Sequence, residues 1–283
     1  MIQIEQVEIA GLNPAMRGMR NPMNSWDRSD SRFCGVICPN EDGCMGCPMW
    51  FGPDDEGAGQ MKTGCQMAPR AKSARWEEYI IGPKDHALAT KLSAGGSVHA
   101  KYRRMIVVWA DITAPLYWWK EFDTYKVGTV ANSCSTMHKI HEKEFVMEDF
   151  SAEHLYGAPS DGGTGGRLYP KDVLDLTIRT LNACREQYMN VHNSLRQEQT
   201  ADQRARLVKK HEELWWQMIQ LLPSSYNQKR TVMFSYEMLA NATFWRTEHK
   251  LDEWRDFCQW ARTLPYSELF TVPRDEKDIS SKA

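Results

Sequence analysis

The strongest constraint on how this chain folds is a short apolar segment near its middle, KYRRMIVVWADI at residues 101–112. In an extended strand, the odd positions of 105–109 and the even positions of 106–110 would face opposite ways, and both sets are largely apolar. A strand that is apolar on both faces must be covered on both sides, so the segment predicts a buried strand. Pro115 follows it and opens a short aromatic helix that contains Trp118 and Trp119.

Helical patterns dominate the rest of the chain. A helix is expected from Pro83 to the Gly95-Gly96 stop, and a long one from Pro170. The charged stretch 192–212 predicts a solvated tip between two helices, and further helices are expected near 235–249 and 251–264. The predicted fold class is therefore α+β, helix-dominated, with a small mixed sheet flanked by long helices.

Composition narrows the classes of protein. The 283 residues are 42% hydrophobic and carry a formal charge of -2, which excludes wholesale disorder and a global basic footprint for nucleic acid. No apolar run approaches the roughly 18 residues that span a bilayer, and Glu5 and Glu8 interrupt the N-terminal segment where a secretory signal would be apolar. We expect a soluble, cytoplasmic protein. The expected organisation is an irregular segment at 1–75, an α+β domain at 76–270 and a disordered tail at 271–283.

A loop rich in glycine and proline gathers half of the eight cysteines. They are Cys34, Cys38, Cys44 and Cys47. Because cytosolic thiols stay reduced, four thiolates in such a loop predict a structural metal, most simply zinc. The wide spacing between Cys34 and Cys38 also leaves an iron–sulfur cluster open, and the plain alternative is a surface loop with unliganded thiols.

A polar stretch, FDTYKVGTVANSCSTMHKIH, follows the aromatic helix. Its hydroxyls, amide and cations are the components of a phosphate or nucleotide cradle, although a Ser- and Asn-rich turn explains them as simply. Cys134 with His138 nearby could pair a nucleophile with a base, but no third orienting group is evident. Outside this stretch, His99 stands at the boundary of two elements, and Asn241 and Arg246 lie five residues apart on one expected helix.

In order along the chain, these pieces resemble the flavin-dependent thymidylate synthases over roughly residues 81–265. The helix ending at Gly96-Ser97-Val98-His99 stands where the family has Pro-Phe-Glu-His, and residues 124–129 stand where its Arg-His-Arg-x-x-Ser begins. Leu222-Pro223, a β-prone TVMF and the pair Asn241 and Arg246 match its C-terminal pattern. The segments MRNPMNSWD, WWKEFDTYKVGT, SCSTMHK and LPSSYNQKRT also resemble uncharacterised phage and prophage proteins, which implies a phage origin and the host-cell cytoplasm.

The family resemblance implies a homotetrameric flavoprotein that alkylates a deoxyuridine nucleotide at C5, with FAD as cofactor. It implies that Arg246 is catalytic and contacts the pyrimidine. Cofactor binding falls to His99, Lys126, Thr129 and Asn241, and substrate binding to Asn132, Ser133, Ser135, His138 and Arg246.

The chain departs from the family where Thr124, Tyr125 and Lys126 replace the leading Arg-His-Arg, whose arginines carry much of the flavin contact. The alternative is therefore a non-catalytic phage protein on the same scaffold that binds a nucleotide or another protein.

Overall fold

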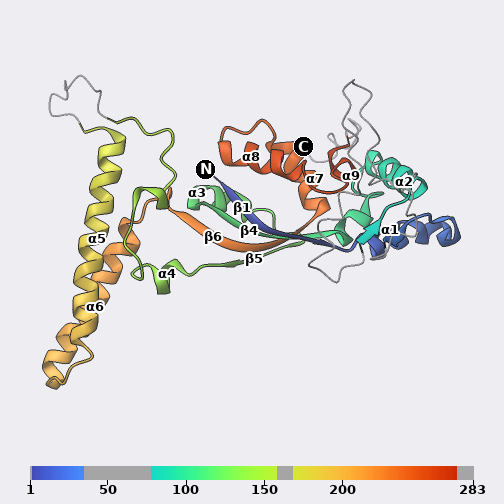
Figure 1. Ribbon diagram of the computed structural model, residues 1–283. Coiled ribbons are helices and arrows are strands. Elements are labelled where there is room, and N and C mark those ends of the chain that lie inside the picture. The colour runs from blue at the N-terminus through green and yellow to red at the C-terminus, as the bar shows by residue number, and fades with distance from the viewer. Residues whose placement is uncertain (1, 35–77, 158–167, 273–283) are drawn as a thin grey trace, which may run out of the picture. The chain divides into compact units, whose positions relative to one another are not determined.

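The computed structural model describes residues 2–34, 78–157 and 168–272 of the chain (Figure 1). They fall into two compact units. The first holds the described parts of Met1–Val7, Trp109–Met233 and Glu248–Phe257, and the second those of Glu8–Val108, Phe234–Thr247 and Cys258–Ala283. No helix in these described ranges is long and apolar enough to cross a membrane.

A four-stranded sheet has the order β1-β4-β6-β5. Its strands are β1 (Gln3–Ala10), β4 (Val107–Pro115), β5 (Thr129–Ser133) and β6 (Asn227–Ser235). Strands β4 and β6 are antiparallel, because the Leu116 N–H donates to the Tyr226 carbonyl and the Tyr236 N–H to that of Ile106, both at 3.0 Å.

Strand β4 confirms the predicted buried strand on one of its faces. Alternate side chains along it are at most 1% exposed, namely Val108, Ala110, Ile112 and Ala114. The opposite face is half-buried, and the strand begins at Val107, later than expected. Residues Lys101–Met105 form a 3₁₀ turn, η3, since Tyr102 and Arg103 direct their polar ends into buried hydrogen bonds.

In the first unit, the aromatic helix α3 (Leu116–Phe122) packs against α8 (Asp252–Ala261). The indole of Trp118 lies 4.9 Å from that of Trp254 and 5.8 Å from the Phe257 ring, centre to centre. Trp118 and Trp119 are fully buried, as their place in an amphipathic aromatic helix predicts.

Two long helices, α5 (Pro170–Ser194) and α6 (Ala201–Leu221), lie side by side as a helical hairpin (Figure 1). The apolar stripe of α5 is buried: Leu174, Ile178, Leu181 and Tyr188 form one cluster with Leu214 and Met218 of α6. The connection from the sheet covers this cluster through Phe145 and Phe150. It carries the short helices α4 (Thr136–Lys139) and η4 (Met147–Asp149).

The second unit is built mainly from helices. They are α1 (Leu12–Arg20), η1 (Asn21–Met23), η2 (Trp26–Arg28), α2 (Pro83–Ala94), α7 (Tyr236–Arg246) and α9 (Glu268–Thr271). A small antiparallel pair joins β2 (Arg32–Cys34) to β3 (Glu78–Ile80). Two buried ion pairs fix these parts: Arg20 Nε lies 2.5 Å from Asp85 Oδ1, and Arg103 Nη2 lies 2.7 Å from Glu237 Oε2.

Three sequence expectations need correction or lie outside the described part. The N-terminal segment, expected to be irregular to residue 75, contains the regular elements β1 and α1. Strand β1 has little apolar periodicity of its own and forms through pairing with β4, which only the tertiary structure supplies. The stretch expected to be a turn contains β5 and α4. The expected disordered tail lies almost wholly outside the described residues.

Candidate functional site

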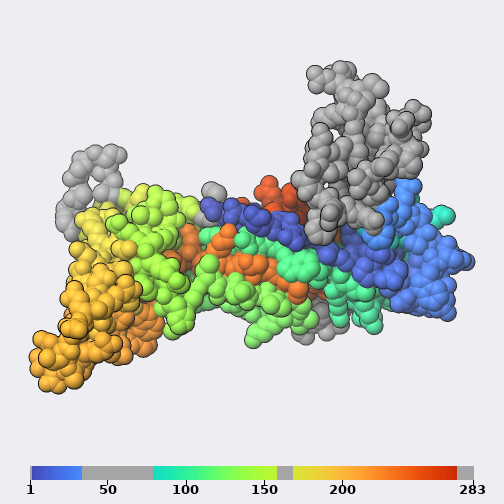
Figure 2. Space-filling view, turned by 60° about the horizontal axis from the view of Figure 1, so that its bottom comes forward, coloured from blue at the N-terminus to red at the C-terminus, as the bar shows by residue number. Residues whose placement is uncertain are grey.

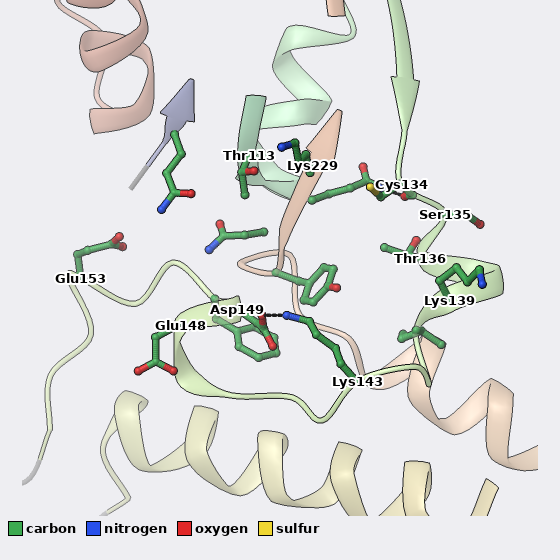
Figure 3. Close-up of a pocket in the computed structure, with 16 residues that line it drawn as sticks. Thr113, Cys134, Ser135, Thr136, Lys139, Lys143, Glu148, Asp149, Glu153 and Lys229 are labelled. Carbon is green, nitrogen blue, oxygen red and sulfur yellow. Dashed lines mark hydrogen bonds and ion pairs between the residues drawn. The ribbon is translucent and has the colours of Figure 1, made fainter. Parts of the chain in front are cut away.

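A cavity of about 610 Å³ opens in the first unit where β5 leads into α4 (Figure 3). Its lining comes from β1, β4, the segment from Cys134 to Glu153, and the start of β6. It lies on the polar stretch that the sequence singled out, and Cys134, Ser135, Thr136 and Lys139 from that stretch line it.

Local hydrogen bonds hold the rim of this cavity in place. The Cys134 N–H donates to the Lys229 carbonyl at 3.0 Å, and the Gln228 side-chain amide donates to the Cys134 carbonyl at 3.0 Å. The Ser135 hydroxyl accepts the backbone N–H of His138 at 3.1 Å and so caps α4. These contacts fix the backbone of the β5–α4 junction against β6.

Charges around the cavity are balanced. The lining lysines are Lys139, Lys143 and Lys229, and the lining carboxylates are Glu148, Asp149 and Glu153. Lys143 pairs with Asp149, as the dashed line in Figure 3 marks, and Lys139 pairs with Glu142. Lys229 lies 3.2 Å from Asp111 and 3.3 Å from Glu5, and these hydrogen-bonded carboxylates raise its pKa. The cavity therefore suits a polar ligand that is held chiefly by hydrogen bonds.

The sequence-predicted residues of this unit fall on one exposed segment. Ser135 lines the cavity, while Asn132, Ser133 and His138 are exposed beside it on β5 and α4. Lys126 is exposed just before β5. The Thr129 hydroxyl oxygen is buried and has no hydrogen-bond partner among the described residues, so it retains the capacity to bond a ligand.

A second cavity, of about 910 Å³, lies in the second unit and contains His99. One wall is the segment from Gly18 to Arg28, and the other comes from α2 and the residues around Tyr102. The His99 side chain is exposed at this cavity. No sequence pattern joins the MRNPMNSWD segment to His99, because only the packing of α1 against α2 and η3 brings them together.

Asn241 and Arg246 both lie on α7, partly buried, and neither is among the residues that line the two cavities. At the positions of the lost Arg-His-Arg, two side chains have local structural contacts. The Thr124 hydroxyl donates to the Glu121 carbonyl at 2.7 Å, and the Tyr125 ring lies 5.6 Å from the Trp254 ring.

The expected metal site lies mostly outside the described residues. Cys38, Cys44 and Cys47 fall in the undescribed segment, and Cys34 is placed only as the end of β2. Among the residues that the structure describes, no group of three or more metal-ligating side chains could hold an ion. Burial raises the pKa of the Cys258 thiol to about 11, which makes it an inert core residue, and Cys134 is exposed.

The residues that sequence reasoning missed are cavity cations contributed by distant segments. Lys143 and Lys229 border the first cavity, and Arg28, Lys84 and Lys101 border the second. Isolated lysines and arginines in polar surroundings carry no sequence signal of their own. Only the cavity geometry identifies them.

Comparisons with known proteins add a whole-chain match. No protein-family model and no curated protein matches the chain. Two crystal structures of thymidylate synthase ThyX from Helicobacter pylori, each with FAD and dUMP, match with a TM-score of 0.52 at 12% identity. The first match covers 96% of this chain and 97% of the other. The chain has the fold of the flavin-dependent thymidylate synthases.

This match confirms the predicted fold class and the remote resemblance, both of which the sequence indicated. A structure of the UMP/dUMP methylase PolB from Streptomyces cacaoi, bound with 5-Br dUMP, covers 96% of this chain at 12% identity with a TM-score of 0.47.

Proposed function

We propose that the protein binds a deoxyuridine nucleotide and alkylates its pyrimidine ring at C5 in a flavin-dependent reaction. One observation carries the proposal: the fold of an enzyme solved with FAD and dUMP matches this chain from end to end, over 96% and 97% of the two chains. At 12% identity this match supports the shared fold alone. Support for the nucleotide and the flavin must come from the residues of this chain.

The nucleotide is assigned to the polar cavity of the first unit. Ser135 lines it, and Asn132, Ser133 and His138 border it with hydroxyl, amide and imidazole groups that hydrogen-bond a sugar, a base or a phosphate. The Lys139–Glu142 pair at its rim is exposed, and an exposed ion pair contributes only about 0–1 kcal/mol, so a phosphate can displace Glu142 from Lys139. The family resemblance alone assigns Arg246 of α7 to the pyrimidine, because Arg246 does not line this cavity.

The residues present fit a flavin. One observation supports the fit: a large cavity at His99 is lined by apolar and cationic side chains. His99, Lys126, Thr129 and Asn241 are the residues assigned to hold it. When bound, a reduced flavin would supply the hydride that completes the new C5 substituent.

The discriminating experiment is the spectrum of the purified protein. We expect absorbance near about 450 nm, the general flavin band, either as isolated or after incubation with FAD. Calorimetric titration with dUMP should show binding by the same preparation. A colourless protein that neither reconstitutes with FAD nor binds dUMP contradicts the proposal.

A second function is favoured by the contacts at positions 124 and 125. There the Thr124 hydroxyl bonds the end of α3 and the Tyr125 ring packs on Trp254. The family has at position 124 an arginine that contacts the flavin, and at position 125 a histidine. On this alternative the protein binds a nucleotide without catalysis. Nucleotide binding with no flavin binding under any loading condition would select it.

A further inference from the structure

The cavity at His99 has a surplus of positive charge, in contrast to the balanced cavity of the first unit. Its charged lining residues are Arg20, Asp27, Arg28, Lys84 and Lys101. Arg20 is neutralised by Asp85, its buried partner at 2.5 Å. Three cations therefore face one carboxylate at this cavity, and all three are exposed. Anionic groups are the natural ligands of such a surface.

The same cavity also offers an apolar surface. Met19, Leu88, Leu92, Val98 and Tyr102 line it. At about 910 Å³ it lies near the upper end of the roughly 300–1,000 Å³ that small-molecule pockets occupy. An apolar wall beside cations fits a large ligand with flat rings and phosphates, which is the chemistry of a dinucleotide.

The wall that carries Arg28 is fixed in place by buried contacts. Asp85, fully buried, accepts hydrogen bonds from Arg20 Nε, Ser29 Oγ and Ser31 Oγ, each at 2.5 Å. Arg20 also donates to the Ser25 carbonyl at 3.3 Å. This network, which we call the Asp85 latch, ties the segment after α1 to the start of α2. It fixes the backbone of both segments, which carry the cavity residues Arg28 and Lys84.

We propose that this cavity binds the phosphate-bearing part of the flavin dinucleotide, and that Arg28, Lys84 and Lys101 supply the cations that bind its phosphates. The assignment rests on the proposed function and adds to it a set of binding residues. It also gives a role to the MRNPMNSWD segment, which the cavity of the first unit does not involve.

The test compares FAD with riboflavin, which has the same ring system but no phosphates, on the full-length protein. Binding is followed by quenching of flavin fluorescence. In the double variant Arg28→Ala/Lys101→Ala, the affinity for FAD should fall at least about tenfold, because charge-assisted hydrogen bonds are lost. The affinity for riboflavin should not change.

The matched control is the double variant Arg17→Ala/Lys91→Ala. It removes the same charge from exposed positions of α1 and α2 that do not line the cavity, and it should bind FAD like the wild type. Arg28→Lys should retain part of the affinity, since a cation remains. Thermal unfolding by circular dichroism checks that every variant is folded.

The possible outcomes distinguish a failure of this cavity assignment from a failure of the proposed function. A wild type that binds FAD, with a cavity double variant that binds it equally well, overturns this assignment and leaves the proposed function standing. Equal losses for FAD and riboflavin also overturn it, because the cations would then not act on phosphate. A wild type that binds no flavin overturns the proposed function and this assignment together.

Discussion

Arg246 lies at the end of α7, partly buried, where its guanidinium can both pack and hydrogen-bond. If it contacts the pyrimidine, Arg246→Ala removes charge-assisted hydrogen bonds worth about 1.5–3 kcal/mol. We expect dUMP binding to weaken by roughly ten- to a hundredfold. Arg246→Lys should recover little of it, because one ammonium cannot reproduce the planar fork. Calorimetric titration with dUMP measures both effects.

Arg255 serves as the control for Arg246. It is exposed as expected, and its guanidinium pairs with Asp252 and donates to the His249 and Lys250 carbonyls. Arg255→Ala should therefore cost a little stability at the start of α8 and leave dUMP affinity unchanged. If Arg246→Ala folds and binds dUMP like the wild type, the assignment of Arg246 to the pyrimidine is wrong.

The Asp85 latch gives a stability prediction. Burial raises the pKa of Asp85, but hydrogen bonds from Ser29, Ser31 and Arg20 outweigh it and lower the pKa overall. Asp85→Ala leaves the Arg20 charge buried without its partner, which costs about 3–5 kcal/mol of unfolding free energy. Denaturant unfolding measures the loss.

The double variant Arg20→Met/Asp85→Leu distinguishes an uncompensated charge from simple loss of contacts. Replacing a buried pair with apolar side chains is often close to neutral, so the double variant should be more stable than Asp85→Ala. A double variant as unstable as Asp85→Ala would show that the hydrogen bonds themselves provide the stability.

At the scale of elements, the helical hairpin contains a stack of aromatic and imidazole rings. The Tyr188 ring lies 3.9 Å from that of His211 and 4.7 Å from that of His141, and His192 lies 5.5 Å from His211. One ring nitrogen each of His141 and His211 is buried with no hydrogen-bond partner among the described residues. Such buried imidazoles are favoured in their neutral form.

Stability of this hairpin should therefore depend on pH. Burial is the main cause that lowers the pKa of both His141 and His211 below the ordinary 6.5, and the neighbouring His192 lowers both pKa values further. The carboxylates of Glu142 and Glu212 act in the opposite direction, on His141 and His211 respectively. At His141 the cations Lys139 and Arg185 also lower the pKa. Since the unfolded chain takes up protons first as pH falls below about 6.5, the folded state loses stability in that range.

The measurement is the thermal unfolding midpoint at about pH 7.5 and about pH 5.5. The wild type should melt at a lower temperature at the acidic pH. His211→Phe keeps a ring in the stack without a titrating group, so the difference should shrink. His138→Gln, a change at an exposed histidine outside the stack, should leave the difference as it is. An equal pH dependence in His211→Phe would contradict the role of the stack.

Hydrophobic periodicity in the sequence predicted the elements that bury an apolar face of their own. It missed the strands that form only by pairing with a neighbouring strand. Helix α5 begins at Pro170 and buries Leu174 and Ile178, as its apolar spacing indicated. Strands β1 and β5 are polar and largely exposed, and both edges of the sheet form only because β4 and β6 are there to pair with. Local sequence contains no signal for such strands.

Among the residues of the candidate sites, too, some could be predicted from the sequence and others could not. The hydroxyl-rich segment around Ser135 could be selected from its composition, and His99, Asn241 and Arg246 came from family resemblance. The sequence could not predict that Arg28 and Lys101 line the same cavity. They are distant in sequence, and only the packing of α1, α2 and η3 places both at it.

At the scale of the whole molecule, we expect assembly into a homo-oligomer. Val127 and Val130 are 84% and 61% exposed, and Met137 is 55% exposed, beside the predicted substrate residues of β5 and α4. Exposed apolar side chains that surround a binding segment are typical of an interface. Sedimentation should show a tetramer at about micromolar concentration, and Val127→Asp/Val130→Asp should shift it toward monomer.

A control for that shift is Val173→Asp/Leu176→Asp, which changes two exposed apolar residues on α5 instead. It should leave the assembly intact. A wild type that sediments only as a monomer would contradict the expected homo-oligomer.

The β2–β3 pair has a consequence for how this chain can change. Cys34 and Glu78 are direct register partners, so the two described ends that flank residues 35–77 are held at neighbouring positions. A segment whose two ends are clamped together can be shortened, lengthened or exchanged with little effect on the surrounding fold, because loop-closure entropy grows slowly with length. Changes of length between Cys34 and Glu78 should therefore cost the rest of the fold little stability.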